Sequence, residues 1–297
     1  MSTANTVGVQ LPKAGPTRVA GSRGAMRREK TVTGIFVGLF VVLVIVLYVY
    51  PLLNLVNVSF KTSAEFMSDP IGVTNQLSFR NYGRVIVGND FIRNFFNSLY
   101  YLLAANVLTL ASTALAAFVI SRRYVRFANF FYVLFLAGIF LPDPLIPQFY
   151  LLNAIGLYNN PIGYILLKAN PGIVMLLMVG YYRTIPKAFD EAAALDGCGT
   201  TRYLFTFIFP MSRPIFASAA ILFSVGVWND IIGTTVFLTS PRYYPVIRAL
   251  FSFVGQYGTD WPPLAAAVFV VATPLIILFL FFQKYIISSL VTGGVKG

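Results

Sequence analysis

The sequence predicts an all-α protein that crosses a membrane six times, and three observations carry this prediction. Hydrophobic residues make up 57% of the 297 residues and charged residues only 11%, whereas an average soluble chain carries about 25% charged residues. The mean hydropathy is +0.75. Apolar stretches also recur along the chain, and several approach or exceed the ~20 residues with which a helix crosses the hydrocarbon of a bilayer.

The first two spans follow a basic tail. Residues 1–30 are polar and carry six basic residues against one acidic residue, which predicts a flexible cytoplasmic tail. The uncharged run that follows contains a span near 34–56. It is too long for the apolar region of a signal peptide and lacks a small-residue cleavage site, which argues against a cleaved leader. An external loop with short helices is predicted at 57–93, and a second span at about 95–120.

Prolines interrupt the next two spans. The third begins near Phe127 and meets three prolines between residues 141 and 147, which must bend or end the helix. The fourth, at about 163–182, contains Lys168, whose long side chain can reach the outer interface, and a potential kink at Pro171-Gly172.

Two spans remain in the last third of the chain. The fifth is predicted at about 214–238, with Trp228-Asn229-Asp230 inside it, and the sixth at about 263–282. The polar residues at 239–262 predict an external loop, and a short tail at 291–297 ends the chain. The six-span domain is therefore placed at 31–290.

The distribution of charge predicts which side of the membrane the termini occupy. Six spans place both termini on one side, and the segments predicted on that side hold fifteen of the 22 basic residues. Because Lys and Arg collect in cytoplasmic loops, the termini and the loop at 184–213 are predicted to be cytoplasmic. The net charge of +12 is therefore ascribed to membrane orientation and not to nucleic-acid binding.

Composition also excludes several kinds of chemistry. The chain has one cysteine and no histidine, so it has no internal disulfide and lacks the commonest metal ligand and general base. The phosphate-binding pattern Gly-x-x-x-x-Gly-Lys-Ser/Thr is absent from the sequence, so the chain cannot hydrolyse ATP through such a loop. We therefore expect no enzyme activity, no metal site and no cofactor in this chain, and any ATP must be bound by a partner.

The 184–213 loop is expected to form two short helices. Pro186 suits a first helical position, and acidic residues at 190 and 191 favour the positive end of a helix dipole. Gly197 can adopt the left-handed conformation that ends a helix, and Pro210 is expected to end the second helix. The alanines at 192–194 would let a partner approach closely, although alanine is also simply the best helix former.

The spacing of this loop resembles that of a known family. Glu191-Ala192-Ala193 is followed after three residues by Gly197 and thirteen positions later by Pro210, which resembles the EAA loop of ABC-importer permeases. The chain departs from that pattern in having phenylalanine at 207 and 209, where aliphatic residues are usual. The resemblance implies the ABC type I importer permease fold and a loop that sits in a groove on a cytoplasmic ATPase subunit. The implied coupling residues are Glu191, Ala192, Ala193, Asp196, Gly197 and Pro210.

The last third resembles the carbohydrate class of these permeases, in particular the smaller permease of maltose-type sugar importers. The resemblance is carried by Trp228-Asn229-Asp230 and by the tail at 293–297. It implies import of di- or oligosaccharides across a prokaryotic cell membrane. It also implies a second, similar permease, two ATPase subunits that bind ATP and Mg, and an external solute-binding protein. The tail residues implied to contact the ATPase are Gly294, Val295, Lys296 and Gly297.

Sugars need hydrogen-bonding groups and aromatic faces, and several residues in or near the spans offer them. The candidates for a translocation path are Asn97, Asn106, Gln148, Trp228, Asn229 and Asp230. A charge at the centre of a span costs ~2.5–3.5 kcal/mol, so Asp230 should face protein or a water-filled cavity. A paired carboxylate near the outer interface and a role in the path both remain open.

The 239–262 loop is a candidate contact for the external binding protein. Members of the family that the sequence resembles use this loop for that purpose, and the implied residues are Tyr243, Tyr244, Gln256 and Tyr257. The alternative is a solvated connector.

Two other functions were weighed against a sugar importer. An ion-coupled secondary transporter would need carboxylates inside the membrane and often shows inverted repeats, but Asp230 is the one such carboxylate and no convincing repeat is visible. A permease for an anionic cargo such as glycerol phosphate would favour arginine in the predicted spans, and none lies there. We therefore expect alternating access driven by a partner ATPase.

Overall fold

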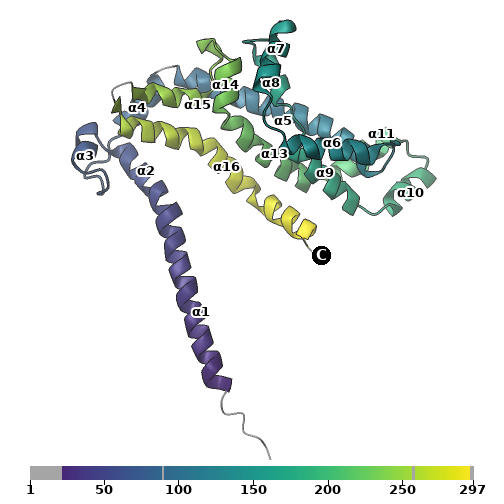
Figure 1. Cartoon of the computed structure of the whole chain (residues 1–297), viewed down its shortest axis with the longest axis horizontal. Helices are drawn as coiled ribbons and strands as arrows, with labels where there is room; N and C mark the ends of the chain where they lie inside the picture. The colour runs from purple at the N-terminus through teal and green to yellow at the C-terminus, as the bar shows by residue number, and fades with distance from the viewer. Residues whose placement is uncertain (1–21, 89, 256–257, 295–297) are drawn as a thin grey trace, which may run out of the picture. The chain divides into compact units, whose positions relative to one another are not determined.

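The computed structural model describes residues 22–88, 90–255 and 258–294, and side chains over most of that range. The chain divides into two compact units, residues 1–54 and 55–297. The first unit contains α1 (Ser22–Val44), a π-helical turn at Ile45–Val49 and the start of α2 (Tyr50–Phe60) (Figure 1). The described part of the predicted flexible tail is already helical from Ser22. The stretch Thr33–Phe60 is long and apolar enough to cross a membrane, since it contains an 18-residue window with a mean hydropathy of 2.8.

Two π-helical turns in the chain occur immediately before an aromatic-proline pair. Ile45–Val49 precedes Tyr50-Pro51, and Leu204–Ile208 precedes Phe209-Pro210. In each, the aromatic N–H donates to the carbonyl five residues earlier. Proline lacks an N–H, and its ring collides with the carbonyl four residues earlier, so a wider turn lets the helix continue. After Pro51 the helix continues to Phe60, whereas after Pro210 it ends one residue later, at Met211, and the chain bends by 73° into the next helix. The expectation that Pro210 ends its helix is therefore confirmed to within one residue.

From Phe91 onward, the second unit contains one long helix followed by two broken spans. The long helix is α5 (Phe91–Ser121). The third span consists of α6 (Ala128–Phe140) and α7 (Leu145–Ala154), bent by 109°, and the fourth of α8 (Pro161–Lys168) and α9 (Gly172–Thr184), bent by 46°. Both interruptions that the prolines predicted are therefore present.

The fifth span is broken where the sequence predicted a continuous helix over 214–238. Helix α13 (Arg213–Trp228) ends, and α14 (Ile231–Phe237) begins after Asn229 and Asp230. The break is stabilised locally, because the Asp230 carboxylate accepts a hydrogen bond from the Gly233 N–H at 3.0 Å and thus caps α14. The last span is the single helix α16 (Trp261–Gly294), which contains Pro274.

The predicted external segments contain short elements. The 57–93 loop forms α3 (Ser63–Ser68) and α4 (Arg80–Val87), which confirms the expected short helices. The 239–262 segment is folded and is not a plain connector. Its described elements are the 3-10 turn Pro241–Tyr243, α15 (Val246–Ala249), the 3-10 turn Leu250–Phe253, and the antiparallel strands β1 (Val254–Gly255) and β2 (Gly258–Thr259), in which Val254 pairs with Thr259.

Two hydrophobic clusters hold the second unit together. The first packs α5, α8, α13, α14, α15 and α16 around buried residues such as Trp228, whose indole N–H donates to the Val271 carbonyl at 3.0 Å. The second packs the other half of α5 against α9 and against Tyr203, Leu204 and Ile208 of the 184–213 loop. Helices α5 and α13 contribute to both clusters, so they connect the loop to the rest of the unit.

Candidate functional site

The 184–213 loop forms two helical segments joined by a tight turn. The first is α10 (Ala188–Leu195), and the second begins as α11 (Thr200–Tyr203) and continues through the π turn to α12 (Phe209–Met211). Between them Gly197 has φ +67°, as its predicted role in ending the helix requires. The Cys198 N–H donates to the Ala193 carbonyl at 2.8 Å and closes the turn.

This loop displays large apolar side chains on its surface. Leu195 is 89% exposed, and Phe189 and Phe207 are each about half exposed. A cavity of about 300 Å³ lies between the two helical segments, and its lining includes Ala192, Ala193, Asp196, Cys198, Arg202 and Phe207. Of the predicted coupling residues, Ala193 is half-buried and the other five are exposed. The loop therefore has the form of a surface that a partner protein can cover.

A buried ion pair fixes the loop to the end of α5. The Arg122 side chain is 4% exposed, its Nε lies 3.0 Å from Asp190 Oδ2, and its guanidinium donates to the Ile185 carbonyl at 3.0 Å. The second Asp190 oxygen accepts from the Tyr203 hydroxyl at 2.6 Å. Burial, followed by this hydrogen bond, raises the pKa of Tyr203 to about 12. Sequence reasoning used Arg122 for orientation alone and Asp190 only as a residue near a helix dipole, so it missed this contact.

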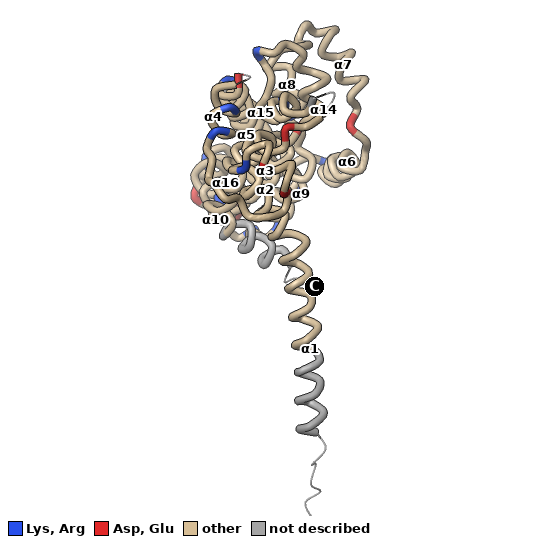
Figure 2. The backbone as a smooth tube through the Cα atoms, turned by 90° about the vertical axis from the view of Figure 1, so that its left-hand side faces the viewer, with Lys and Arg blue, Asp and Glu red and all other residues tan. Residues whose placement is uncertain are grey.

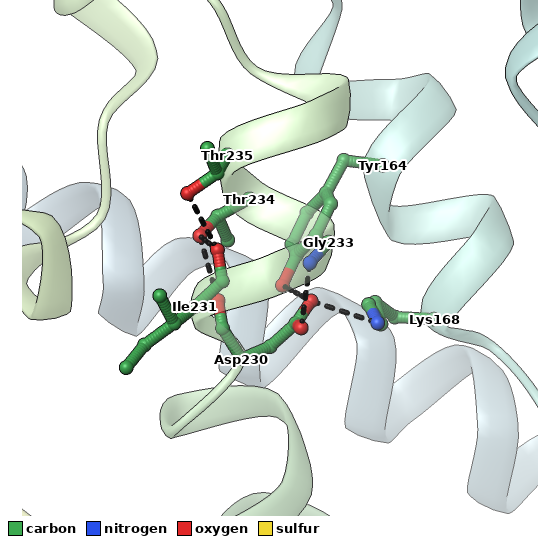
Figure 3. A network of polar contacts seen from close by, with 7 residues as sticks. All are labelled: Tyr164, Lys168, Asp230, Ile231, Gly233, Thr234 and Thr235. Carbon is green, nitrogen blue, oxygen red and sulfur yellow. Dashed lines mark hydrogen bonds and ion pairs between the residues drawn. The ribbon is translucent and has the colours of Figure 1, made fainter. Parts of the chain in front are cut away.

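Charged residues are sparse along the described helices (Figure 2). A second, partly buried ion pair joins Lys168 at the end of α8 to Asp230 before α14. Asp230 Oδ2 lies 2.7 Å from Lys168 Nζ and accepts from the Tyr164 hydroxyl at 2.9 Å, as Figure 3 shows. Its other oxygen caps α14 through Gly233. A Cβ on Gly233 would lie 2.3 Å from Asp230 Oδ2, so the cluster needs glycine at that position. Of the two interpretations of Asp230, this geometry favours the paired carboxylate.

The other candidates for a translocation path differ in their exposure and in their hydrogen-bond partners. Trp228 is 2% exposed, so in this conformation it packs helices together and does not line a path. The Asn229 amide donates to the Val225 carbonyl at 3.1 Å, and Gln148 is half-buried in α7. The Asn106 amide donates to Ser224 Oγ at 2.9 Å, and its side-chain oxygen is buried without a partner among the described residues. A path role for these polar residues stays a prediction.

The backbone of residues 242–246 is held by side chains of α5. The bonds run from Asn97 Nδ2 to the carbonyls of Arg242 (2.9 Å) and Tyr244 (3.0 Å), from the Tyr101 hydroxyl to the Tyr243 carbonyl (2.8 Å), and from the Val246 N–H to Ser98 Oγ (2.8 Å). Asn97, predicted to line a path, is therefore used to hold this segment.

The remaining predicted contact residues lie near that segment or beyond the described chain. Tyr243 and Tyr244 are both half-buried. The Arg248 guanidinium lies 3.7 Å from the centroid of the Tyr244 ring, which orders this part of the segment. Gln256, Tyr257 and the tail residues Val295, Lys296 and Gly297 lie outside the described residues, and Gly294 is the last residue of α16.

The fold and these contacts define the class of the protein. It is a helical membrane protein with three long spanning helices and up to six spans when each bent pair counts as one, and a two-helix loop exposes apolar side chains. Within the described residues, no group of three His, Cys, Asp or Glu side chains could hold a metal ion. The chain belongs to the family of binding-protein-dependent transport system inner membrane components, whose pattern matches residues 86–291. It is therefore a non-catalytic, multi-pass membrane subunit of a transporter complex with ATPase and binding-protein partners.

Relatives of this chain are ABC transporter permeases. The probable ABC transporter permease protein YurM of Bacillus subtilis is 32% identical over 270 residues, which cover 89% of each chain. The arabinooligosaccharides transport system permease protein AraQ of Halalkalibacterium halodurans is 30% identical over 84% of this chain and 91% of its own length. The melibiose/raffinose/stachyose import permease protein MelC of Bacillus subtilis is 28% identical over 92% of this chain and 100% of its own. The predicted resemblance to carbohydrate-class permeases is thus confirmed.

A solved structure shares the fold. One chain of a bacterial ABC transporter involved in the import of the acidic polysaccharide alginate superposes with a TM-score of 0.75, over 89% of this chain and 98% of that chain. The sequence identity is 22%. The predicted six-span importer permease fold is therefore confirmed.

We expect Gly197→Val to destabilise the loop and Gly197→Asn to be tolerated. No atom lies within 4 Å of a Cβ at this position, so the cost comes from the left-handed backbone alone, about 1–2 kcal/mol for a β-branched residue and less for asparagine. Thermal unfolding of the detergent-purified complex measures the effect. Equal melting temperatures for both variants would show that the turn does not need positive φ.

We expect Asp230→Asn to lower stability by about 1–3 kcal/mol, because it leaves the partly buried Lys168 charge without its partner while keeping a capping oxygen. The double variant Lys168→Met/Asp230→Asn removes both charges and should recover most of that loss. Thermal unfolding of the three proteins tests this expectation. A single variant as stable as the wild type would contradict it, and a stable double variant without uptake would assign Asp230 to the translocation path.

Proposed function

We propose that this chain is the permease subunit of an ATP-driven importer of sugars, with di- or oligosaccharides as cargo. Support comes from relatives named for arabinooligosaccharides, for melibiose, raffinose and stachyose, and for galactooligosaccharides. These names favour a saccharide over glycerol phosphate, and membership of the family argues against an ion-coupled secondary transporter. Among the polar candidates for the translocation path, Asn106 is the one that we propose for sugar binding, because its side-chain oxygen is buried without a partner among the described residues.

We propose further that the 184–213 loop couples this subunit to the ATPase. The observation that carries this proposal is the exposure of Leu195 at 89% on α10, one turn beyond Glu191 and next to the ordered turn at Gly197. A single exposed leucine is ordinary, but Leu195 lies on the same loop as the half-exposed Phe189 and Phe207, which line the cavity between the two helical segments. An apolar surface that gathers on one loop in this way is typical of a site that a partner covers. The alanines at 192–194 allow that partner to approach the helix closely.

The proposed assembly follows from this docking. A second, similar permease completes the membrane part, two ATPase subunits bind ATP and Mg beneath it, and a binding protein delivers sugar on the external side, near Tyr243 and Tyr244. Both termini and the loop lie in the cytoplasm, where residues 1–30 and 291–297 form tails around the 31–290 domain. Closure of the ATPase dimer moves α10 and opens the translocation path to the outside. ATP hydrolysis then reverses this movement.

Leu195→Ser should reduce recovery of the ATPase with this subunit by about tenfold, because full burial of a leucine side chain against a partner is worth about 1.5–3 kcal/mol and about 1.4 kcal/mol corresponds to a tenfold change in affinity. The measurement is co-purification from the native membrane, with ATPase activity assayed in the eluate. Leu195 is exposed, so the variant should insert and fold normally.

The matched control is Leu77→Ser, because Leu77 is also highly exposed, at 72%, but lies in the 57–93 loop. It should leave recovery of the ATPase unchanged. Unchanged recovery with both variants would show that the loop does not dock through α10, and equal losses with both would indicate a general effect of polar substitution on assembly.

A further inference from the structure

Helix α5 differs from the other candidate spans among the described residues. Each of the others contains a proline, a glycine or a break, whereas the 31 residues of α5 include neither proline nor glycine. At about 1.5 Å per residue, its length is roughly 46 Å, which exceeds the ~30 Å of bilayer hydrocarbon. Sharp bends in helices arise mainly at proline, at glycine and at irregular turns. Its composition therefore makes α5 the stiffest span of the described chain.

The two ends of α5 contact two different surfaces. Near its first turns, Asn97, Ser98 and Tyr101 bind the backbone of residues 242–246 through four hydrogen bonds of 2.8–3.0 Å. These bonds go to main-chain groups, so they fix the position of the segment and not merely the orientation of its side chains. This segment contains Tyr243 and Tyr244, which are among the proposed contacts of the binding protein.

The other end of α5 is joined to the 184–213 loop. Arg122 reaches Asp190 at the first turn of α10 and the Ile185 carbonyl before it, and Asp190 in turn binds Tyr203 of the second helical segment. Arg123, the next residue, has φ +57°, and the Tyr124 N–H donates back to the Val119 carbonyl at 3.1 Å. This turn fixes the backbone of Arg122 at the end of the helix.

We propose that α5 is a strut that transmits movement between residues 242–246 and the 184–213 loop, with Arg122 as the positioning residue at the loop end. This inference rests on the proposed function, in which the loop docks on an ATPase and the outer segment meets a binding protein. When the ATPase dimer closes, α10 moves, Asp190 pulls on Arg122, and α5 carries the displacement to the carbonyls held by Asn97 and Tyr101.

Helix α13 is the competing route, because it also belongs to both hydrophobic clusters. It joins the helix Thr200–Met211 at a bend of 73°, and its other end is the break at Asn229 and Asp230. A helix with a joint at each end absorbs displacement at those joints. The uninterrupted helix is therefore the better transmitter.

The experiment compares Val107→Gly with Val107→Ala in the full transporter complex. Val107 lies in the middle of α5 and is 69% exposed, so both variants remove the same exposed side chain, and only glycine softens the helix. Spin labels at Arg242→Cys, an exposed position whose backbone carbonyl is held by Asn97, and at Leu77→Cys, in a Cys198→Ser background, report the distance between residues 242–246 and the 57–93 loop. The probe is ATP with vanadate, which traps the closed ATPase dimer and requires no sugar.

We expect trapping to shift this distance by about 2 Å in the wild type, the scale of helix shifts in switching transitions. Val107→Ala should keep that shift, and Val107→Gly should reduce it by at least half while ATPase recovery stays unchanged. Equal shifts in the two variants would overturn the strut, as would the absence of any shift in the wild type. Unchanged ATPase recovery with Leu195→Ser would instead count against the proposed function.

Arg122 provides a second, independent measurement. Arg122→Gln should reduce the trapped shift as Val107→Gly does, and Arg122→Lys, which keeps the charge beside Asp190, should restore part of it. If the role of Arg122 were purely structural, the variants would differ in thermal stability, but the size of the trapped distance shift would not fall in the order wild type, Arg122→Lys, Arg122→Gln.

Leu222→Gly in α13, compared with Leu222→Ala, tests the competing route. A reduced distance shift for Leu222→Gly, together with a normal distance shift for Val107→Gly, would assign transmission to α13.

Discussion

A helix that is interrupted inside a bilayer must find partners for the backbone groups that the break exposes, because no water is available there. The breaks in this chain are stabilised in different ways. Asp230 caps α14 through the Gly233 N–H, and at the break between α8 and α9 the Asn170 side-chain oxygen accepts from the Gly172 N–H. The fold depends on these local solutions, since each supplies a partner for a backbone N–H at a break within a span.

Buried charge follows the same constraint. In both ion pairs the carboxylate has an additional hydrogen-bond partner, Tyr164 for Asp230 and Tyr203 for Asp190, whereas Arg122 Nη2 is buried without a partner among the described residues. A buried pair repays its desolvation only when geometry is good and the remaining polar groups are satisfied. Each pair also joins elements that are distant in sequence, so it fixes which helices meet. In this chain, ionic contacts therefore contribute to the specificity of packing as well as to stability.

The spans, the proline interruptions and the left-handed turn at Gly197 could be predicted because each depends on one stretch of sequence. The break at Asn229-Asp230 was also accessible, since Asp before an apolar helix is a capping signal, but the hydrophobicity of the whole stretch concealed it. The pairing of Lys168 with Asp230 and of Arg122 with Asp190 could not be predicted, because it depends on how helices pack. The same limit applies to Trp228 and Asn97, whose residue types suit sugar binding but whose positions serve packing.

Arg122 shows that one basic residue can fulfil two physical requirements. Its charge is one of those that predict the side of the membrane on which the 121–126 turn lies, a role that the neighbouring exposed Arg123 and Arg126 can share. Its side chain is 4% exposed and bound to Asp190 and the Ile185 carbonyl, a role that its neighbours do not share. A count of charges weighs the three residues equally, whereas burial separates them. The residues that predict orientation and the residue that joins the loop to α5 therefore lie at the same end of that helix, next to the surface on which we propose that an ATPase docks.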